Sequence, residues 1–148
     1  MKPLHLILLL FCFCSCHHSQ YAKETMEITQ YLQNFIPSQP LSNGTVILIN
    51  SKGCPVCIAR GYKSIKESKQ LMGNCKIIII SQKAFEKVDG DQSSMNPRLL
   101  IDHADILEKM NLPVAGFTLI RFKAGAITTI KYYNPEVSEQ PLAMFFSN

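Results

Sequence analysis

The 148-residue sequence predicts one α/β domain built on a mixed β-sheet. Two runs, residues 45–49 and 75–80, are apolar except for Thr45 and Lys76 and have the composition of strands that are buried on both faces. Between them, apolar side chains recur at helical spacing, and a strand–helix–strand unit of this kind pairs its strands in parallel by a right-handed crossover. Residues 116–122 and 127–132, separated by a turn sequence at 123–125, predict an antiparallel hairpin.

The other expected elements surround this frame. Residues 22–35 predict an additional N-terminal helix with Ile28, Leu32 and Phe35 on one face. The helix after the first strand is expected to continue to Gly73-Asn74. The remaining expectations are a helical turn at 84–88, a short strand at 98–101, a helix at 103–110 capped by Asp102, and a short final helix at 137–146.

Composition argues for a packed domain and against a nucleic-acid binder. The chain is 47% hydrophobic and 18% charged, as expected for a globular fold with one core. Its net charge of +4 is mild. Four basic residues, Arg60, Lys63, Lys66 and Lys69, fall on one expected helix without interleaved aromatic residues, which is typical of a solvated helix face.

The first 16 residues predict a targeting segment. Lys2 supplies a positive charge, and the apolar stretch at residues 4–13 is too short for a permanent membrane span. Ser15 directly precedes Cys16, and this ending resembles a bacterial lipoprotein signal in which Cys16 becomes the lipidated first residue. Residues 17–43 would then form a tether and the N-terminal helix, and residues 44–148 the α/β domain.

Other readings of this segment stay open. It also fits an ordinary secretory signal or an uncleaved anchor. Cys12 and Cys14 are alternative processing sites, although no small residue precedes either of them. If the segment is removed at Cys16, three cysteines remain as thiols, Cys54, Cys57 and Cys75, in a compartment where disulfides persist. Three thiols give one pair and one spare, which is not a disulfide scaffold.

The sequence Cys54-Pro55-Val56-Cys57 lies where the first strand gives way to a helix. Two thiols at this spacing can form one disulfide, and the helix N-terminus lowers the pKa of the first thiol. Lys52 is the one nearby charged group placed to favour the thiolate. The alternatives are an inert disulfide and a zinc site that would combine both cysteines with Cys75 and His103. We assign no metal and no cofactor, and the absence of a His after Cys57 excludes covalent haem attachment.

Segments 46–57 and 106–125 carry a family resemblance. Across roughly residues 43–134 the chain resembles bacterial membrane-anchored, thioredoxin-like thiol–disulfide oxidoreductases. The resemblance implies a thioredoxin-like fold, in which helices flank a central mixed sheet, and a redox-active disulfide. Cys54 would be the more exposed attacking thiol and Cys57 the resolving one. It further implies a lipid-anchored, periplasm-facing protein whose partners are cysteine-containing extracytoplasmic proteins and a membrane electron donor.

The chain departs from that family's pattern at three positions. Gly53 replaces the usual tryptophan, and Leu48 replaces a buried acid. Phe117 aligns with the family's cis-proline, so Gly116 and Phe117 are expected beside the disulfide as substrate-binding residues, in a trans arrangement. Pro113 lies four residues earlier. The rival prediction is therefore a catalytically inactive, thioredoxin-like binding lipoprotein with a structural disulfide.

Overall fold

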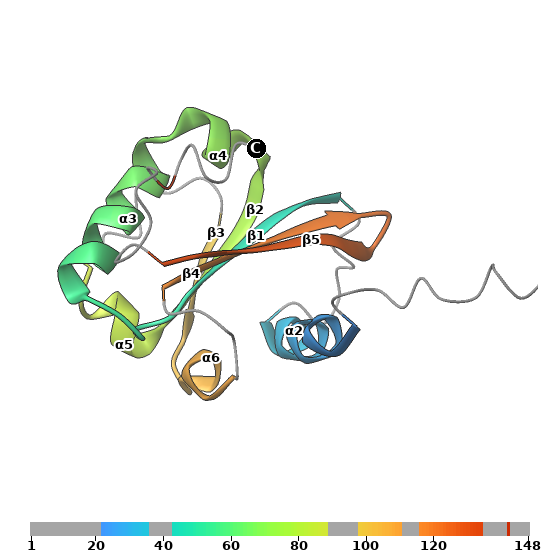
Figure 1. Cartoon of the computed structure of the whole chain (residues 1–148), viewed down its shortest axis with the longest axis horizontal. Coiled ribbons are helices and arrows are strands. Elements are labelled where there is room, and N and C mark those ends of the chain that lie inside the picture. The colour runs from blue at the N-terminus through green and yellow to red at the C-terminus, as the bar shows by residue number, and fades with distance from the viewer. Residues whose placement is uncertain (1–21, 36–42, 89–97, 111–115, 135–141, 143–148) are drawn as a thin grey trace, which may run out of the picture.

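The computed structural model describes residues 22–35, 43–88, 98–110, 116–134 and 142. Five strands form one mixed sheet in the order β3-β2-β1-β4-β5 (Figure 1). Their bounds are β1 Asn43–Ile49, β2 Cys75–Ser81, β3 Arg98–Asp102, β4 Phe117–Lys123 and β5 Ala126–Tyr133. The predicted α/β class and mixed sheet are confirmed, and the strands begin or end within two residues of the expected positions.

Three parallel strands end at the same edge of the sheet. Ile49 of β1 pairs with Ile80 of β2, and Ser81 pairs with Asp102 of β3. We call this the carboxyl edge. β4 is antiparallel to β1, so it begins here, with Phe117 opposite Ile49. The chain segments that follow β1, β2 and β3, and the one that precedes β4, therefore meet at one place.

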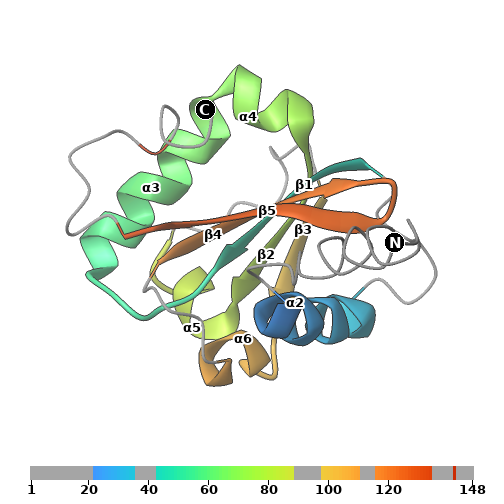
Figure 2. The same cartoon turned by 45° about the vertical axis from the view of Figure 1, so that its right-hand side comes forward.

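Helices cover both faces of the sheet (Figures 1 and 2). Helices α3 (Pro55–Glu67) and α4 (Lys69–Asn74) lie on one face, and α2 (Ala22–Phe35) and α6 (Ile106–Lys109) lie on the other. The short helix α5 (Gln82–Phe85) follows β2 at the carboxyl edge. Strand β1 contributes alternate residues to two cores, Ile47 and Ile49 toward α3 and Val46 and Leu48 toward α2. Such burial on both faces explains its unbroken apolar sequence.

Three expectations about helices need correction. The single helix expected after Cys57 is two helices, because Ser68 is extended at ψ 100° and its N–H bonds back to Ile65 and Ser64. α5 begins at Gln82 rather than residue 84, because the Ser81 hydroxyl accepts the N–H of Ala84 and caps it. α6 spans four residues and not eight, because residues 102–105 continue from the strand as a turn.

Some sequence predictions fall outside the described residues. These are the signal segment with Cys12, Cys14 and Cys16, most of the tether, Pro113, and the expected helix at 137–146 apart from Leu142. Leu142 is buried against the core on the α3 side. Among the described residues, no helix has the length and apolar character needed to cross a bilayer.

Close approach of α3 to β4 requires a glycine. A Cβ on Gly61 would lie 2.5 Å from Cζ of Phe117, whose ring is fully buried and packs edge-on against Tyr133. The ring cannot retreat, because it already fills the core between α3 and the sheet.

We therefore predict that Gly61→Ala lowers the free energy of unfolding by about 1–3 kcal/mol through overpacking. Gly73→Ala is the matched control, since a Cβ there meets nothing within 4 Å, and it should be neutral or stabilising by up to about 1 kcal/mol. Urea denaturation of both variants measures the difference. Equal stabilities would contradict the packing argument.

Candidate functional site

The cysteine motif lies at the start of α3, on the carboxyl edge. Cys54 is the N-cap of this helix, and its Sγ accepts a hydrogen bond from the N–H of Cys57 at 3.3 Å. Pro55 occupies the first helical position, where no backbone donor is needed. The predicted junction of strand and helix is thus observed, with a donor directed at the first sulfur.

Exposure is highest between the two cysteines. Pro55 is exposed and Val56 is 64% exposed, whereas Cys54 and Cys57 are both partly buried. Both residues are thiols in the structure. The expected contrast between an open first thiol and a well-buried second one is therefore smaller than the sequence suggested. An apolar tip, Pro55-Val56, lies at the surface between the sulfurs and offers contact area to a docking segment.

Asn50 fixes the segment that leads to Cys54. It is only 1% exposed, and its Oδ1 accepts the N–H groups of Gly116 at 2.8 Å and Lys52 at 3.1 Å. Its own N–H donates to the carbonyl of Gly116 at 3.0 Å. These bonds tie the end of β1 to the start of β4 and turn the chain toward α3.

Ser51 is held on both of its backbone groups. Its N–H donates to Oε1 of Glu108 at 2.5 Å. Its carbonyl accepts the N–H of Gly53 at 2.9 Å and Nζ of Lys87 at 3.2 Å. The carboxylate of Glu108 on α6 and the ammonium of Lys87 after α5 therefore bind the N–H and the carbonyl of Ser51, just before the motif.

Glu108 also reaches the neighbouring strand. The hydroxyl of Ser81 donates to the same carboxylate oxygen that Ser51 uses. Ser81 is fully buried, and its hydroxyl oxygen accepts the N–H of Ala84 at 3.2 Å. One partly buried carboxylate thus links the ends of β1 and β2.

A second carboxylate holds the other end of α6. Asp102 is 1% exposed, and its Oδ2 accepts the N–H of Leu107 at 2.7 Å and the hydroxyl of Tyr31 at 3.1 Å. Burial, together with the charge of Asp102, raises the pKa of Tyr31 above its ordinary range. The N-cap position of α6 is Asp105 and not Asp102 as expected; Asp102 instead accepts the N–H of Leu107 from the end of β3. Nδ1 of His103 lies 2.8 Å from Oε1 of Gln82.

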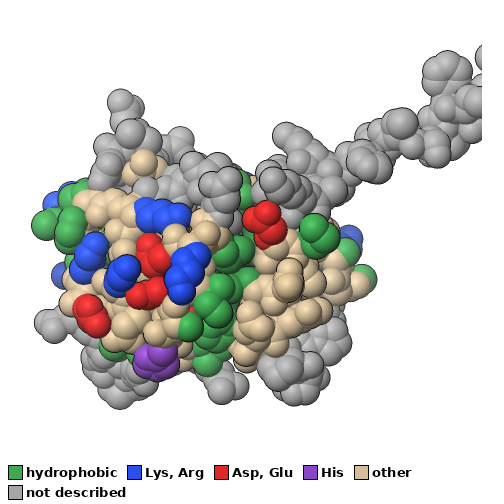
Figure 3. Space-filling view, turned by 90° about the horizontal axis from the view of Figure 1, so that it is seen from below, with side chains coloured by type: hydrophobic (Ala, Val, Ile, Leu, Met, Phe, Trp, Pro, Cys, Tyr) green, Lys and Arg blue, Asp and Glu red, His purple; other side chains and the backbone are tan. Residues whose placement is uncertain are grey.

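Lysines are concentrated at the carboxyl edge. Nζ of Lys52 donates to the carbonyl of Met110 at 3.0 Å, and Nζ of Lys109 donates to the carbonyl of Ala104 at 3.2 Å. Lys83 and Lys87 are also exposed there. On the face shown in Figure 3, Lys and Arg side chains surround a small acidic group, beside a band of hydrophobic side chains. The predicted cation Lys52 is therefore joined by Lys87, which sequence reasoning did not single out.

Cys75 lies at the opposite edge of the sheet from the motif. It begins β2, opposite Thr45, and its Sγ donates to the carbonyl of Ile77 at 3.4 Å. Burial raises its pKa to about 12. Cys75 is thus a buried, neutral thiol. The zinc set of Cys54, Cys57, Cys75 and His103 is not brought together, and the described residues hold no cluster of three ligating side chains.

The expected substrate-binding pair, Gly116 and Phe117, lies at the carboxyl edge next to the end of β1, and both residues are buried. The Phe117 side chain is fully buried, and both backbone polar groups of the buried Gly116 bond Asn50. All peptide bonds in the described segments are trans, including that of Phe117. Phe117 also lies between two paired strands, opposite Ile49 of β1 and Tyr133 of β5.

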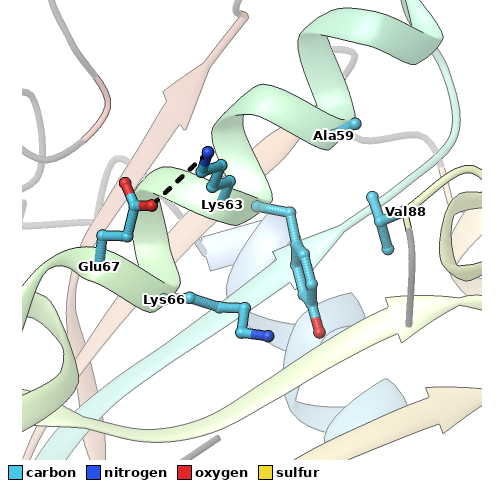
Figure 4. Close-up of a pocket in the computed structure, with 6 residues that line it drawn as sticks. Ala59, Lys63, Lys66, Glu67 and Val88 are labelled. Atoms are coloured by element: carbon cyan, nitrogen blue, oxygen red, sulfur yellow. Dashed lines mark ion pairs between the residues drawn. The ribbon is translucent and has the colours of Figure 1, made fainter. Parts of the chain in front are cut away.

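A pocket of about 410 Å³ lies on a different part of α3 (Figure 4). Its wall is mainly apolar, and Lys63 at its rim pairs with Glu67 at 3.8 Å. The lining residues are Ala59, Tyr62, Lys63, Lys66, Glu67 and Val88. The pocket contains neither cysteine of the motif.

No known family, no curated protein and no solved structure matches this chain.

Four site residues escaped the sequence analysis: Asn50, Ser81, Lys87 and Glu108. Two of them carry a visible signal, because Asn50 and Ser81 are the first polar residues after unbroken apolar strands. Such residues end parallel strands at the edge where sites of α/β folds form. Lys87 and Glu108 carry no comparable signal, since each is one of several charged residues in its segment.

The buried thiol of Cys75 makes alkaline stability predictable. Its pKa rises from an ordinary 9.0 to about 12 on folding, so only the unfolded chain ionises this thiol between those values. The contribution of the Cys75 thiol to the free energy of unfolding is present in full below pH 9 and is lost as pH rises through about 12. Wild type should thus lose about 2 kcal/mol more than Cys75→Ala between pH 8 and 10.5, measured by urea unfolding. Parallel pH profiles would contradict the assignment.

Proposed function

We propose that this chain is an extracytoplasmic thiol–disulfide oxidoreductase with a thioredoxin-like fold, using Cys54 and Cys57 as its redox-active pair. The observation that carries the proposal is the position of Cys54 at the N-cap of α3, with its sulfur accepting the N–H of Cys57. A donor and a helix N-terminus directed at sulfur favour the thiolate, which is the reactive form.

The arrangement of strands supports the finer fold assignment. Strands β2, β1, β4 and β5 are adjacent in that order, with the motif directly after the central strand β1. This arrangement is compatible with the thioredoxin-like fold that the resemblance of segments 46–57 and 106–125 implies. Strand β3 lies outside β2 as an additional edge strand.

The proposed reaction moves two electrons between dithiols. The Cys54 thiolate attacks one sulfur of a partner disulfide, forms a mixed disulfide and expels the other partner sulfur as a thiolate. Cys57 then loses its proton and attacks the Cys54 sulfur. The Cys54–Cys57 disulfide forms, and the partner leaves as a dithiol once its thiolates take up protons. A second dithiol, acting as electron donor, reduces the pair again, and the reverse sequence oxidises a partner.

Localisation belongs to the same proposal. Lipidation at Cys16 would anchor the chain to the cell envelope with the domain facing the periplasm. Its partners would be cysteine-containing proteins in that compartment, with a membrane electron carrier as the dithiol donor. Mass analysis of the membrane-extracted protein tests the anchor: a lipid-modified Cys16 at the N-terminus supports it, and an unmodified or differently cleaved chain contradicts it.

One observation favours the rival, a catalytically inactive binding lipoprotein with a structural disulfide. Both backbone polar groups of Gly116 are occupied by Asn50, and the Phe117 ring is buried. A partner strand would therefore find fewer open groups beside the motif. The midpoint potential of the Cys54–Cys57 pair separates the two functions, because a value below about −300 mV is typical of structural disulfides.

Turnover gives the direct test of the enzyme. In an insulin-reduction assay driven by a dithiol, the wild-type chain should accelerate reduction and Cys54→Ser should abolish the acceleration, because the attacking thiolate is lost. Cys75→Ala is the matched control and should keep activity, since Cys75 lies at the far edge of the sheet. Wild-type Cys54 that is alkylated as slowly as free cysteine at neutral pH would contradict the proposal.

Trapping identifies the partner. Cys57→Ala removes the resolving thiol, so the mixed disulfide at Cys54 should accumulate in cells. Nonreducing electrophoresis should show discrete adducts that vanish with a reductant, and Cys54→Ser in the same background should show none. A lack of adducts in both strains would count against covalent exchange with client proteins.

A further inference from the structure

We propose that Glu108 is a positioning residue for the Cys54 loop, and that its hydrogen bond to Ser51 sets the reactivity of the Cys54 thiol. The inference rests on the proposed thiol–disulfide function and goes beyond it, because the motif itself contains no carboxylate. Glu108 comes from α6, on the opposite face of the sheet from α3, yet its Oε1 accepts the N–H of Ser51, three residues before Cys54.

The ends of β1 and β2 carry two hydrogen-bond donors, the N–H of Ser51 and the hydroxyl of Ser81, that need an acceptor. Ser51 leaves the sheet after β1, so its N–H has no partner strand, and Ser81 is fully buried at the end of β2. Oε1 of Glu108 accepts from both of them. Hydrogen bonds to a carboxylate are shorter and stronger than those to a neutral acceptor. Glu108 thereby fixes the ends of β1 and β2 relative to each other.

Ser51 lies only three residues before Cys54, so its position constrains that of the sulfur. The carbonyl of Ser51 is held by Gly53 N–H and by Nζ of Lys87, so both polar groups of this residue are engaged. Cys54 follows directly after Gly53, and its Sγ lies 3.3 Å from the N–H of Cys57. That contact needs the loop at one fixed position, and Glu108 contributes to it from outside the motif by holding the N–H of Ser51, in addition to the bonds of Asn50 and Lys87.

The position and the charge of the Glu108 carboxylate have opposite effects on the stability of the Cys54 thiolate. A carboxylate close to a thiol disfavours the thiolate, whereas a fixed loop keeps the sulfur at the helix N-terminus and favours it. Glu108→Gln removes the charge and keeps an acceptor oxygen at the same distance. Glu108→Asp keeps the charge and withdraws the acceptor by one methylene group. The two variants therefore separate positioning from simple electrostatics.

The experiment measures the iodoacetamide rate at Cys54 by peptide mapping, and the midpoint potential of the Cys54–Cys57 pair, in the full chain. Glu108→Gln should stay within about twofold of wild type, and Glu108→Asp should react about three to ten times more slowly, with a more negative potential. Lys109→Ala is the matched control on the same helix, because Nζ of Lys109 bonds Ala104, and it should change neither quantity.

The outcomes are distinct from those of the proposed function. A slow wild-type Cys54 contradicts the oxidoreductase itself, whereas a fast wild type with an equally fast Glu108→Asp overturns only this inference. Acceleration by Glu108→Gln of about tenfold with an unchanged Glu108→Asp would assign Glu108 a charge effect alone and also overturn it. If Glu108→Asp does not fold, Glu108→Gln decides through hydrogen exchange at the Ser51 amide and the alkylation rate of Cys54. Exchange and alkylation that both stay near wild type, or that change together, support positioning, and faster exchange at Ser51 with an unchanged Cys54 rate overturns it.

Discussion

The structure depends on how the chain leaves β1. This strand is central and buried on both faces, so water cannot satisfy the backbone groups where it ends. Asn50 supplies partners at this point. Its side-chain Oδ1 accepts the N–H groups of Gly116 and Lys52, and its backbone N–H donates to the carbonyl of Gly116. The same three bonds set the direction of the loop that follows. The position of Cys54 is therefore a consequence of how a buried strand ends.

Much of this architecture could be predicted because a strand that is buried on both faces has consecutive apolar residues instead of an alternating pattern. The apolar runs of β1 and β2 allow few other structures, and the Cys-Pro-Val-Cys junction follows from them. The break at Ser68 could not be predicted, because the apolar spacing continues across it and the turn is stabilised by contacts of its own N–H. The sequence predicted a helix directly after Asp102, whereas α6 begins at Ile106 and Asp102 accepts the N–H of Leu107 across a turn.

The role of Glu108 could not be predicted because it depends on topology. β3 lies outside β2, so the chain must return across the sheet toward β4, and α6 lies on that return path. A four-residue helix has little stability of its own. Both of its ends are held by carboxylates, Asp102 accepting the N–H of Leu107 and Glu108 accepting that of Ser51. The contact between Glu108 and Ser51 joins residues 57 positions apart, which no local pattern records.

Charges of both signs meet at the carboxyl edge, around the loop that leads to Cys54. Glu108 receives two donors on one oxygen, so part of its charge is offset by N–H and O–H dipoles. Lys87 and Lys52 bring ammonium groups to carbonyls of the same region, at Ser51 and Met110. Lys87 binds the carbonyl of Ser51, and Glu108 binds its N–H. Opposite charges thus hold both polar backbone groups of Ser51, three residues before Cys54 takes the N-cap position of α3.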